Sequence, residues 1–261
     1  ISRERYDVYE VFLRGASWKV QLYGKDGGEA ISQVEVDKTD FSFTYNGVKV
    51  KFDFAYIMIH GTPGENGLLQ GYFEMLGVPF STCSSFVSAI TFDKHSCKRF
   101  LDFAGVKMAK DVFLRRGSAW NAEEIIGELG LPVFVKRTNG GSSFGITKVK
   151  RVEELAPAIE LVFKEYDSVI IEESIVGREF TNGIYPKGGE LVRLPVTEIV
   201  TSREFFDYEA KYLGESQEIC PAQIPDELTA RIQDTTEQIY RYMGCSGLVR
   251  MDYIVRNDEI Y

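Results

Sequence analysis

Cysteine and histidine are scarce in this chain, and their scarcity disfavours several classes of site. The four cysteines are scattered and form no Cys-x-x-Cys pair, so neither a disulfide framework nor a zinc site is favoured. No apolar run approaches the ~20 residues of a membrane span, and no charged-then-apolar signal peptide opens the chain. These features favour a protein of a reducing, cytoplasmic environment.

A surplus of basic residues is also missing. Lysine and arginine total 30 against 39 acidic residues, which gives a net charge of −9. This balance argues against a nucleic-acid binder, because phosphate contacts need a basic face. It remains compatible with a small anionic ligand, around which a few lysines can converge. With 261 residues, 44% of them hydrophobic, the chain can bury a substantial core in one large domain or about two to three smaller ones.

The first part of the chain has the pattern of a parallel α/β unit. Apolar residues across 8–18 recur at helix-like spacing and predict a helix, whereas 48–54 alternates as a half-exposed strand should. A buried strand is expected at 55–60, followed by a glycine-rich turn, a helix to about Gly77 and a short strand at 78–80. This order predicts a ligand loop at the carboxyl end of a parallel strand.

Beyond residue 84, helices and strands mix rather than alternate strictly, which predicts small α+β sheets. Helices are expected at 84–90, 93–104, 121–129, 152–166 and 226–243. Strands are expected at 111–114, 133–136, 146–149, 168–172 and 247–255. We therefore predict three domains, at 1–92, 93–176 and 177–261.

The strongest chemical signal is a strand that opens into a glycine- and serine-rich loop. The strand ends at Lys136, and the loop contains Gly140, Gly141, Ser142 and Ser143. Glycine lets backbone N–H groups turn toward an anion, serine hydroxyls add donors, and the lysine supplies a fixed positive charge. The alternative is a plain hairpin turn. Because the lysine precedes the glycines, we predict a nucleotide site that differs from the usual phosphate loop.

Arg250 and Asp252 lie two residues apart on a predicted strand and therefore share one face. In a cleft, the arginine could neutralise a developing oxyanion while the aspartate holds a divalent metal beside a phosphate. The alternative is a surface salt bridge, since alternating charges are common on exposed strand faces.

An acidic stretch follows the buried strand that ends near residue 172. Its candidate residues are Glu172, Glu173, Ile175 and Glu179. Backbone groups of such a connection could bind an adenine edge, and Glu179 could accept hydrogen bonds from ribose hydroxyls. A solvated acidic linker is the competing interpretation.

Two further candidates rest on position alone. Lys211 lies in a long polar segment that could form a lid and bring the lysine to a terminal phosphate, or could be an exposed amphipathic turn. His60 ends the predicted buried strand just before a glycine loop, where a core histidine with satisfied hydrogen bonds is the alternative to a functional one. His95 has no evident partner in the sequence.

Taken in order, these segments resemble the D-alanine:D-alanine ligase family of ATP-grasp enzymes. The resembling motifs are His60-Gly61 with Gly64-Glu65-Asn66-Gly67, Asp93-Lys94, Val135-Lys136 with Gly141-Ser142-Ser143, Tyr208-Glu209-Ala210-Lys211-Tyr212, and Gly247 through Arg250 with Asp252. Any one of them could occur by chance, but all of them in register over about two hundred residues hardly could. The first sixty residues match only loosely.

The resemblance implies an α/β (α+β) fold of three-domain ATP-grasp architecture, with an N-terminal parallel α/β domain and the nucleotide between the central and C-terminal domains. It implies ligation of two D-alanine molecules through a D-alanyl phosphate, at the expense of ATP, for the peptidoglycan precursor. ATP, two magnesium or manganese ions and a homodimer are expected with it.

The same resemblance gives the nucleotide-site candidates their roles. Lys94 and Lys136 would bind the ATP phosphates, and Lys211 would sit near the γ-phosphate. The remaining members, for the phosphate loop and for adenine and ribose, are Ser142, Ser143, Glu172, Glu173, Ile175 and Glu179.

The resemblance also assigns the catalytic residues. Arg250 would stabilise the tetrahedral oxyanion and Asp252 would ligate the metal. His60 would lie near the first D-alanine, while Ser142 and Tyr212 would connect to a glutamate that orients the substrate amine.

Parts of the family pattern have no counterpart in the sequence. The orienting glutamate would lie upstream of Ile1, and the glutamate and asparagine that complete the metal site would lie beyond Tyr261, so we expect the natural polypeptide to include both segments. Three alternatives remain. The first is a D-alanine:D-lactate ligase, against which Tyr212 argues because it resembles the dipeptide-forming type. The other two are another ATP-grasp ligase and a non-catalytic nucleotide-binding relative.

Overall fold

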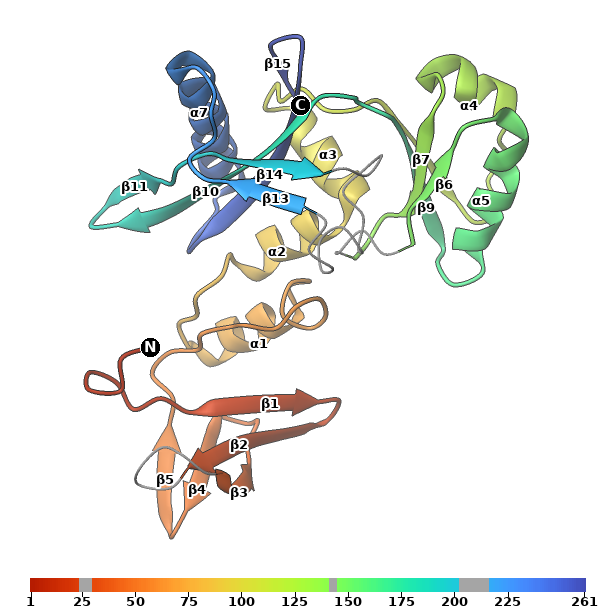
Figure 1. Cartoon of the computed structure of the whole chain (residues 1–261). Helices are drawn as coiled ribbons and strands as arrows, with labels where there is room; N and C mark the ends of the chain where they lie inside the picture. The colour runs from red at the N-terminus through yellow and green to blue at the C-terminus, as the bar shows by residue number, and fades with distance from the viewer. Residues whose placement is uncertain (24–29, 141–144, 202–215) are drawn as a thin grey trace. The chain divides into compact units, whose positions relative to one another are not determined.

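A computed structural model describes residues 1–23, 30–140, 145–201 and 216–261 of the chain (Figure 1). The chain divides into two compact units. The first contains residues 1–56 and 72–80, and the second contains 57–71 and 81–261. Helix α1 (Leu68–Leu76) runs across the boundary between these segments.

The first unit is built from antiparallel strands. Strands β1 (Glu10–Arg14), β2 (Ser17–Tyr23) and β3 (Ala30–Glu35) form a sheet in the order β1-β2-β3, and β4 (Ser42–Tyr45) pairs with β5 (Val48–Lys51) as a hairpin (Figure 1). Edge-to-face and tilted aromatic contacts hold part of its core, including Phe41 against Phe52 and Phe73 at ring-centroid distances of 4.6 and 4.8 Å.

The helix predicted at 8–18 is wrong, because this segment forms most of the β1–β2 hairpin. Arg14 pairs with Ser17, so Gly15 and Ala16 make a two-residue turn, and Gly15 has a φ of +57° that glycine adopts without strain. Exposure alternates along β1, as expected for a strand with one covered face. The spacing of the apolar residues fits both the 3.6-residue period of a helix and the two-residue period of a strand. The turn at Gly15 breaks the segment into two paired strands.

The buried strand predicted at 55–60 is also wrong. Ala55 forms a single parallel bridge with Phe80, and Tyr56 and Met58 are 58% and 78% exposed. Pro79, whose carbonyl accepts from the Ala55 N–H, has no N–H of its own with which to continue a ladder. Among the described residues, the parallel pairing expected for this part of the chain is limited to that bridge.

The first sheet of the second unit is antiparallel. It contains β6 (Asp111–Arg115), β7 (Val133–Arg137), β8 (Thr147–Val149) and β9 (Ser168–Glu173) in the order β6-β9-β7-β8. Helices α4 (Ala122–Leu129) and α5 (Leu155–Phe163) cover one face (Figure 1), and the short helix η1 (Val152–Glu154) directly precedes α5. The strands bury Val133, Val135 and Ile171 against them, which confirms the predicted small α+β sheet.

The second sheet of this unit holds the C-terminal strands. Its members are β10 (Arg178–Lys187), β11 (Glu190–Arg193), β12 (Thr197–Thr201), β13 (Ser216–Ile219), β14 (Val249–Arg256) and β15 (Glu259–Ile260). The order is β13-β12-β10-β14-β15, and β11 also pairs with β10. A core beside it combines residues of these strands with α2 (Ser85–Phe92), α3 (Lys94–Asp102) and α7 (Asp226–Met243).

Local capping signals explain why the helices of the second unit were predictable. The Asp93 carboxylate accepts from the Ser96 N–H at 2.8 Å, and Asn121 Oδ1 accepts from the Glu124 N–H at 3.1 Å. Gly244 ends α7 in the left-handed conformation, with a φ of +68°. None of the described helices combines the length and apolarity needed to cross a membrane.

Truncating a core residue of α5 should destabilise the protein much more than truncating an exposed residue of the same helix. Ile159 is fully buried, so Ile159→Ala should lower the free energy of unfolding by about 2–5 kcal/mol in urea titrations. Leu161 is 57% exposed, and Leu161→Ala should cost about 0.5 kcal/mol or less. Equal losses would contradict the assigned helix face.

Candidate active site

Two adjacent strands place opposite charges on the face of the first sheet that α4 and α5 leave uncovered. Phe134 of β7 pairs directly with Glu172 of β9, so Lys136, two residues further along β7, lies diagonally across from Glu172 on the same face. The Lys136 ammonium forms an ion pair with the Glu172 carboxylate. Because side chains alternate along a strand, Val135 and Ile171 are buried in the core, and Lys136 and Glu172 lie on the opposite face of the sheet.

Helix α3 brings two more lysines to this pair. Lys94 and Lys98 are four residues apart and share one helix face. The Lys94 N–H donates to the carbonyl of Thr138 at 2.8 Å, and its ammonium donates to the carbonyl of Gly140 at 2.7 Å. The Lys98 ammonium reaches Glu172 at 2.8 Å. The start of α3 is thereby fastened to the chain that leaves β7.

The electrostatics of this cluster favour an anionic ligand. Burial and the nearby positive charge of Lys136 lower the pKa of Lys94 from 10.5 to about 8. Burial by itself would raise the pKa of Glu172, but the charges of Lys136 and Lys98 outweigh it and hold that pKa below its ordinary value. A phosphate placed between Lys94 and Lys136 would relieve their mutual repulsion.

The other candidates for adenine and ribose contacts lie at the end of β9, in the connection that follows it and on β10. The Glu173 carboxylate accepts from the Lys110 N–H at 2.7 Å, and Ile175 is half-buried in the connection to β10. Glu179 lies on β10, where its backbone pairs with Ile254 of β14 and Ile199 of β12. The structure thus brings Lys94, Lys136 and Glu172 together, with Glu173 next to Glu172 in the strand.

Arg250 and Asp252 project from one face of β14, as the alternation predicted, and pair with each other. The Arg250 Nε–Asp252 Oδ1 distance is 3.1 Å, and the side chains are 67% and 63% exposed. This is the geometry of a surface salt bridge, which contributes little to stability. In the part of the chain that the structure describes, neither side chain contacts Lys94, Lys136 or Glu172.

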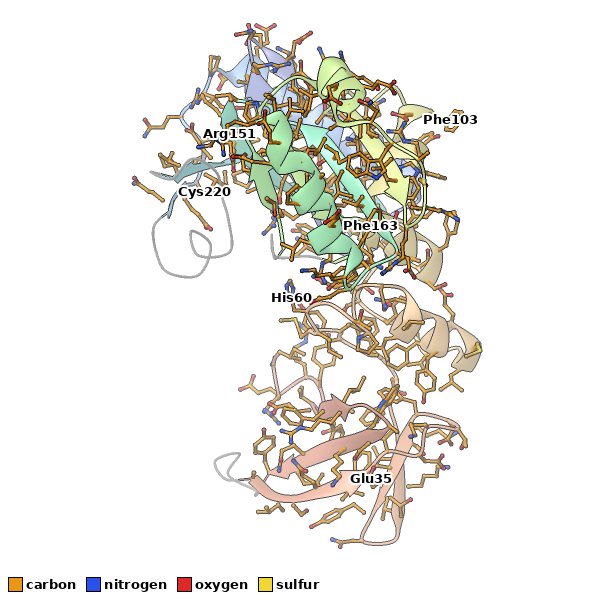
Figure 2. All side chains as sticks on the ribbon, turned by 90° about the vertical axis from the view of Figure 1, so that its right-hand side faces the viewer. Glu35, His60, Phe103, Arg151, Phe163 and Cys220 are labelled. Atoms are coloured by element: carbon orange, nitrogen blue, oxygen red, sulfur yellow. The ribbon has the colours of Figure 1, made fainter. Side chains whose placement is uncertain are left out.

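His60 is exposed, so the interpretation of it as a core histidine is wrong. Its side chain, labelled in Figure 2, is 66% exposed. Its Nδ1 lies 3.5 Å from the Glu65 carboxylate. The other oxygen of Glu65 accepts from the Gly61 N–H at 2.6 Å. Glu65 therefore ties the histidine to the glycine-rich turn that follows it.

Four candidates fall outside the described residues, so the structure assigns them no geometry. They are Ser142, Ser143, Lys211 and Tyr212.

Sequence reasoning missed Lys98 and Asp111. The Lys98 ammonium lies 3.0 Å from Asp111 Oδ1 as well as 2.8 Å from Glu172 Oε1, and the Asp111 side chain is only 4% exposed. The signal for Lys98 was available, because it follows Lys94 by four residues in a predicted helix. No comparable signal marked Asp111, whose role depends on the pairing of β6 with β9.

The described residues do not by themselves form a divalent metal site. They contain no group of three or more histidine, cysteine, aspartate or glutamate side chains that could hold an ion. Asp252 offers one exposed carboxylate, already paired with Arg250, whereas a divalent cation requires several oxygen ligands.

The mixed α+β architecture, in which lysines from a helix and a strand meet at the Glu172 carboxylate, agrees with the class of ATP-grasp ligases. The family description "D-ala D-ala ligase C-terminus" matches residues 100–261. This chain belongs to the D-alanine–D-alanine ligase family.

Similar proteins agree with this assignment. A D-alanine–D-alanine ligase of Phocaeicola vulgatus is 50% identical over 99% of this chain and 78% of its own length. The VanG D-Ala:D-Ser ligase of Enterococcus faecalis is 32% identical with a TM-score of 0.82, covering 100% of this chain and 80% of that one. D-alanyl-alanine synthetase A of Vibrio cholerae is 26% identical with a TM-score of 0.83, and the match covers 99% of this chain and 78% of that one.

The lowered pKa of Lys94 predicts a pH-dependent stability. In the unfolded chain this lysine regains its ordinary pKa of 10.5, so between about pH 8 and 10.5 the unfolded chain binds more protons than the folded one. The contribution of Lys94 to the free energy of unfolding should therefore rise with pH across this window. Urea titrations of the wild type and Lys94→Met from pH 7 to 10 measure this contribution as the difference between their free energies of unfolding. A difference that stays constant with pH would contradict the prediction.

Proposed function

We propose that this protein joins two molecules of D-alanine at the expense of ATP, giving D-alanyl-D-alanine for the peptidoglycan precursor. The observation that carries the proposal is 50% identity over 99% of the chain with a D-alanine–D-alanine ligase. The cluster of Lys94, Lys136 and Glu172, with its excess of positive charge, supports a nucleotide phosphate as one ligand. Family membership implies use of ATP and, in general, a divalent metal ion.

The chemistry explains why ATP is required. A carboxylate is a poor electrophile, so the carboxylate of one D-alanine takes the γ-phosphoryl group and ADP departs. The amine of the second D-alanine attacks the carbonyl carbon of the acyl phosphate, and inorganic phosphate leaves. The intermediate would hydrolyse unless the closed site excluded water.

In this proposal, Lys94 and Lys136 hold the ATP phosphates, with Lys211 near the γ-phosphate. The 2.7 Å distance from the Lys94 ammonium to the Gly140 carbonyl supports the proposal, because it keeps the ammonium at the residue where the glycine-rich segment begins. Further contacts to ATP are proposed from the phosphate loop and from the adenine and ribose subsites. The residues that make them are Ser142, Ser143, Glu172, Glu173, Ile175 and Glu179.

We assign the D-alanine side of the reaction to four residues. Arg250 stabilises the oxyanion of the tetrahedral intermediate, and its exposed position on β14, where a solvent-exposed pair with Asp252 holds it only weakly, supports this role. His60 lies near the first D-alanine, and Ser142 and Tyr212 connect to the group that orients the amine of the second. Asp252 would contribute one ligand to magnesium or manganese, for which two ions are expected.

The division into domains at 1–92, 93–176 and 177–261, a homodimer and a cytoplasmic location complete the proposal. The alternatives are less well supported. The D-alanine–D-alanine ligase of Phocaeicola vulgatus, at 50% identity, does not favour a D-alanine:D-lactate ligase or a non-catalytic relative for this chain.

The experiment that tests the function is phosphate release from ATP and magnesium by the full-length protein. Release should require D-alanine, should not occur with L-alanine, and should accompany a product with the mass of D-alanyl-D-alanine. Adding D-lactate tests the depsipeptide alternative through the mass of its product. If D-alanine stimulated no release, the proposed activity would be refuted.

Replacing Arg250 should chiefly reduce kcat. If it acts as one donor to the oxyanion, Arg250→Ala should cost about 2.7–4 kcal/mol of transition-state stabilisation, or about 10²–10³ in kcat. Arg241 is the control, because it is also an exposed arginine paired with one carboxylate, Glu237, at 2.8 Å. Arg241→Ala should leave kcat unchanged, and an effect of Arg250→Ala confined to KM would count against the oxyanion role.

A further inference from the structure

Lys98 is a buried lysine whose ammonium has a full set of acceptors. Its side chain is 10% exposed, and its Nζ lies 2.5 Å from the Ala109 carbonyl, 3.0 Å from Asp111 Oδ1 and 2.8 Å from Glu172 Oε1. An ammonium has three protons, and these acceptors take all of them. Lys98 therefore has no donor left for a ligand, and any role it has in binding must act through a neighbour.

The neighbour that matters is Glu172. One oxygen of its carboxylate contacts Lys98 and the other contacts Lys136, while its side chain is 13% exposed. Two cations on opposite oxygens fix the plane of the carboxylate, because rotation would break both contacts. Lys136 is the more exposed of the two lysines, at 20% against 10%.

Pairing within this network leaves a surplus of positive charge. Asp111 has a second partner in Arg99, whose guanidinium lies 2.6 Å from Oδ1. If Arg99 balances Asp111 and Lys98 balances Glu172, the charges of Lys94 and Lys136 remain for an anion. Without Lys98, Lys136 would be the nearest cation to a carboxylate that burial already penalises, and their mutual attraction would compete with the ligand.

We propose that Lys98 is a positioning residue of the nucleotide site, which holds the Glu172 carboxylate and leaves Lys136 available to ATP. The inference rests on the proposed placement of ATP at Lys94, Lys136 and Glu172. It also gives Lys98 a part in the preference for adenine over guanine. A fixed carboxylate can accept from the amino group of adenine, whereas the carbonyl at the same position of guanine would be repelled.

Steady-state kinetics of Lys98→Met test this role, since methionine fills a similar volume without charge. The KM for ATP should rise about 10-fold or more, by analogy with groups that orient metal ligands, while kcat changes much less. The preference for ATP over GTP, measured as the ratio of kcat/KM values, should fall. A kcat loss with unchanged KM and unchanged base preference would overturn the proposal.

Arg99→Met is the matched control. Arg99 lies on the same helix and pairs with the same aspartate, but its partners are Asp111 and Asp102 rather than Glu172. Because Arg99 does not touch Glu172, the control should raise the KM for ATP clearly less than Lys98→Met does and should keep the wild-type base preference. If both variants raised KM equally, Lys98 would act through Asp111 and general stability, and the positioning role would be refuted.

A double variant shows whether Lys98 acts through Glu172. In a Glu172→Gln background, Lys98→Met should raise the KM for ATP little further, because the group that it positions is already neutral. Full additivity would contradict the proposal. Should Lys98→Met not fold by circular dichroism, Lys98→Gln makes the same test, since its amide still donates in the buried position but carries no charge.

Calorimetric titration of the wild type with ATP separates this inference from the proposed function. Failure of the wild type to bind ATP would refute the nucleotide site itself. Binding by the wild type with equal affinity in Lys98→Met would refute only the role of Lys98.

Discussion

The shared Glu172 carboxylate is the interaction on which the candidate site depends. It joins three elements, because Lys98 comes from α3, Lys136 from β7 and Glu172 itself from β9. Charges this poorly exposed are costly unless they are paired, so the register of β7 against β9 and the position of α3 must be satisfied together. The same network includes Asp111 of β6 and thereby reaches the edge of the sheet.

This network explains how an acidic protein can hold an anion. The chain has a net charge of −9, yet Lys98 and Arg99 match Glu172 and Asp111, and the charges of Lys94 and Lys136 remain. Helix α3 supplies both the structural lysine and one of the two that remain, four residues apart on one face. Burial of its ammonium, together with the nearby charge of Lys136, lowers the pKa of Lys94.

The segments predicted correctly are those in which local signals agree with tertiary packing. Helix α7 carries its own capping glycine and was predicted at its observed bounds, and β7 and β9 bury one face as their composition indicated. The first eighty residues were predicted less well. Between Arg14 and Ser17 a glycine turn overrides a helical spacing, and beyond Ala55 an apolar run lacks a partner strand among the described residues. Pairing partners are non-local, so local patterns could not reveal them.

By itself, the sequence determined the family motifs, the bounds of α7 and the shared strand face of Arg250 and Asp252, since each depends on residues close together in the chain. It also identified Lys94, Lys136 and Glu172 as candidates. Only the tertiary structure decided that these three meet, that Arg250 and Asp252 pair with each other, and that Lys98 and Asp111 belong to the network. The reason is that a buried charge takes its partners from whichever strands and helices fold against it, and neither burial nor strand order is written in local spacing.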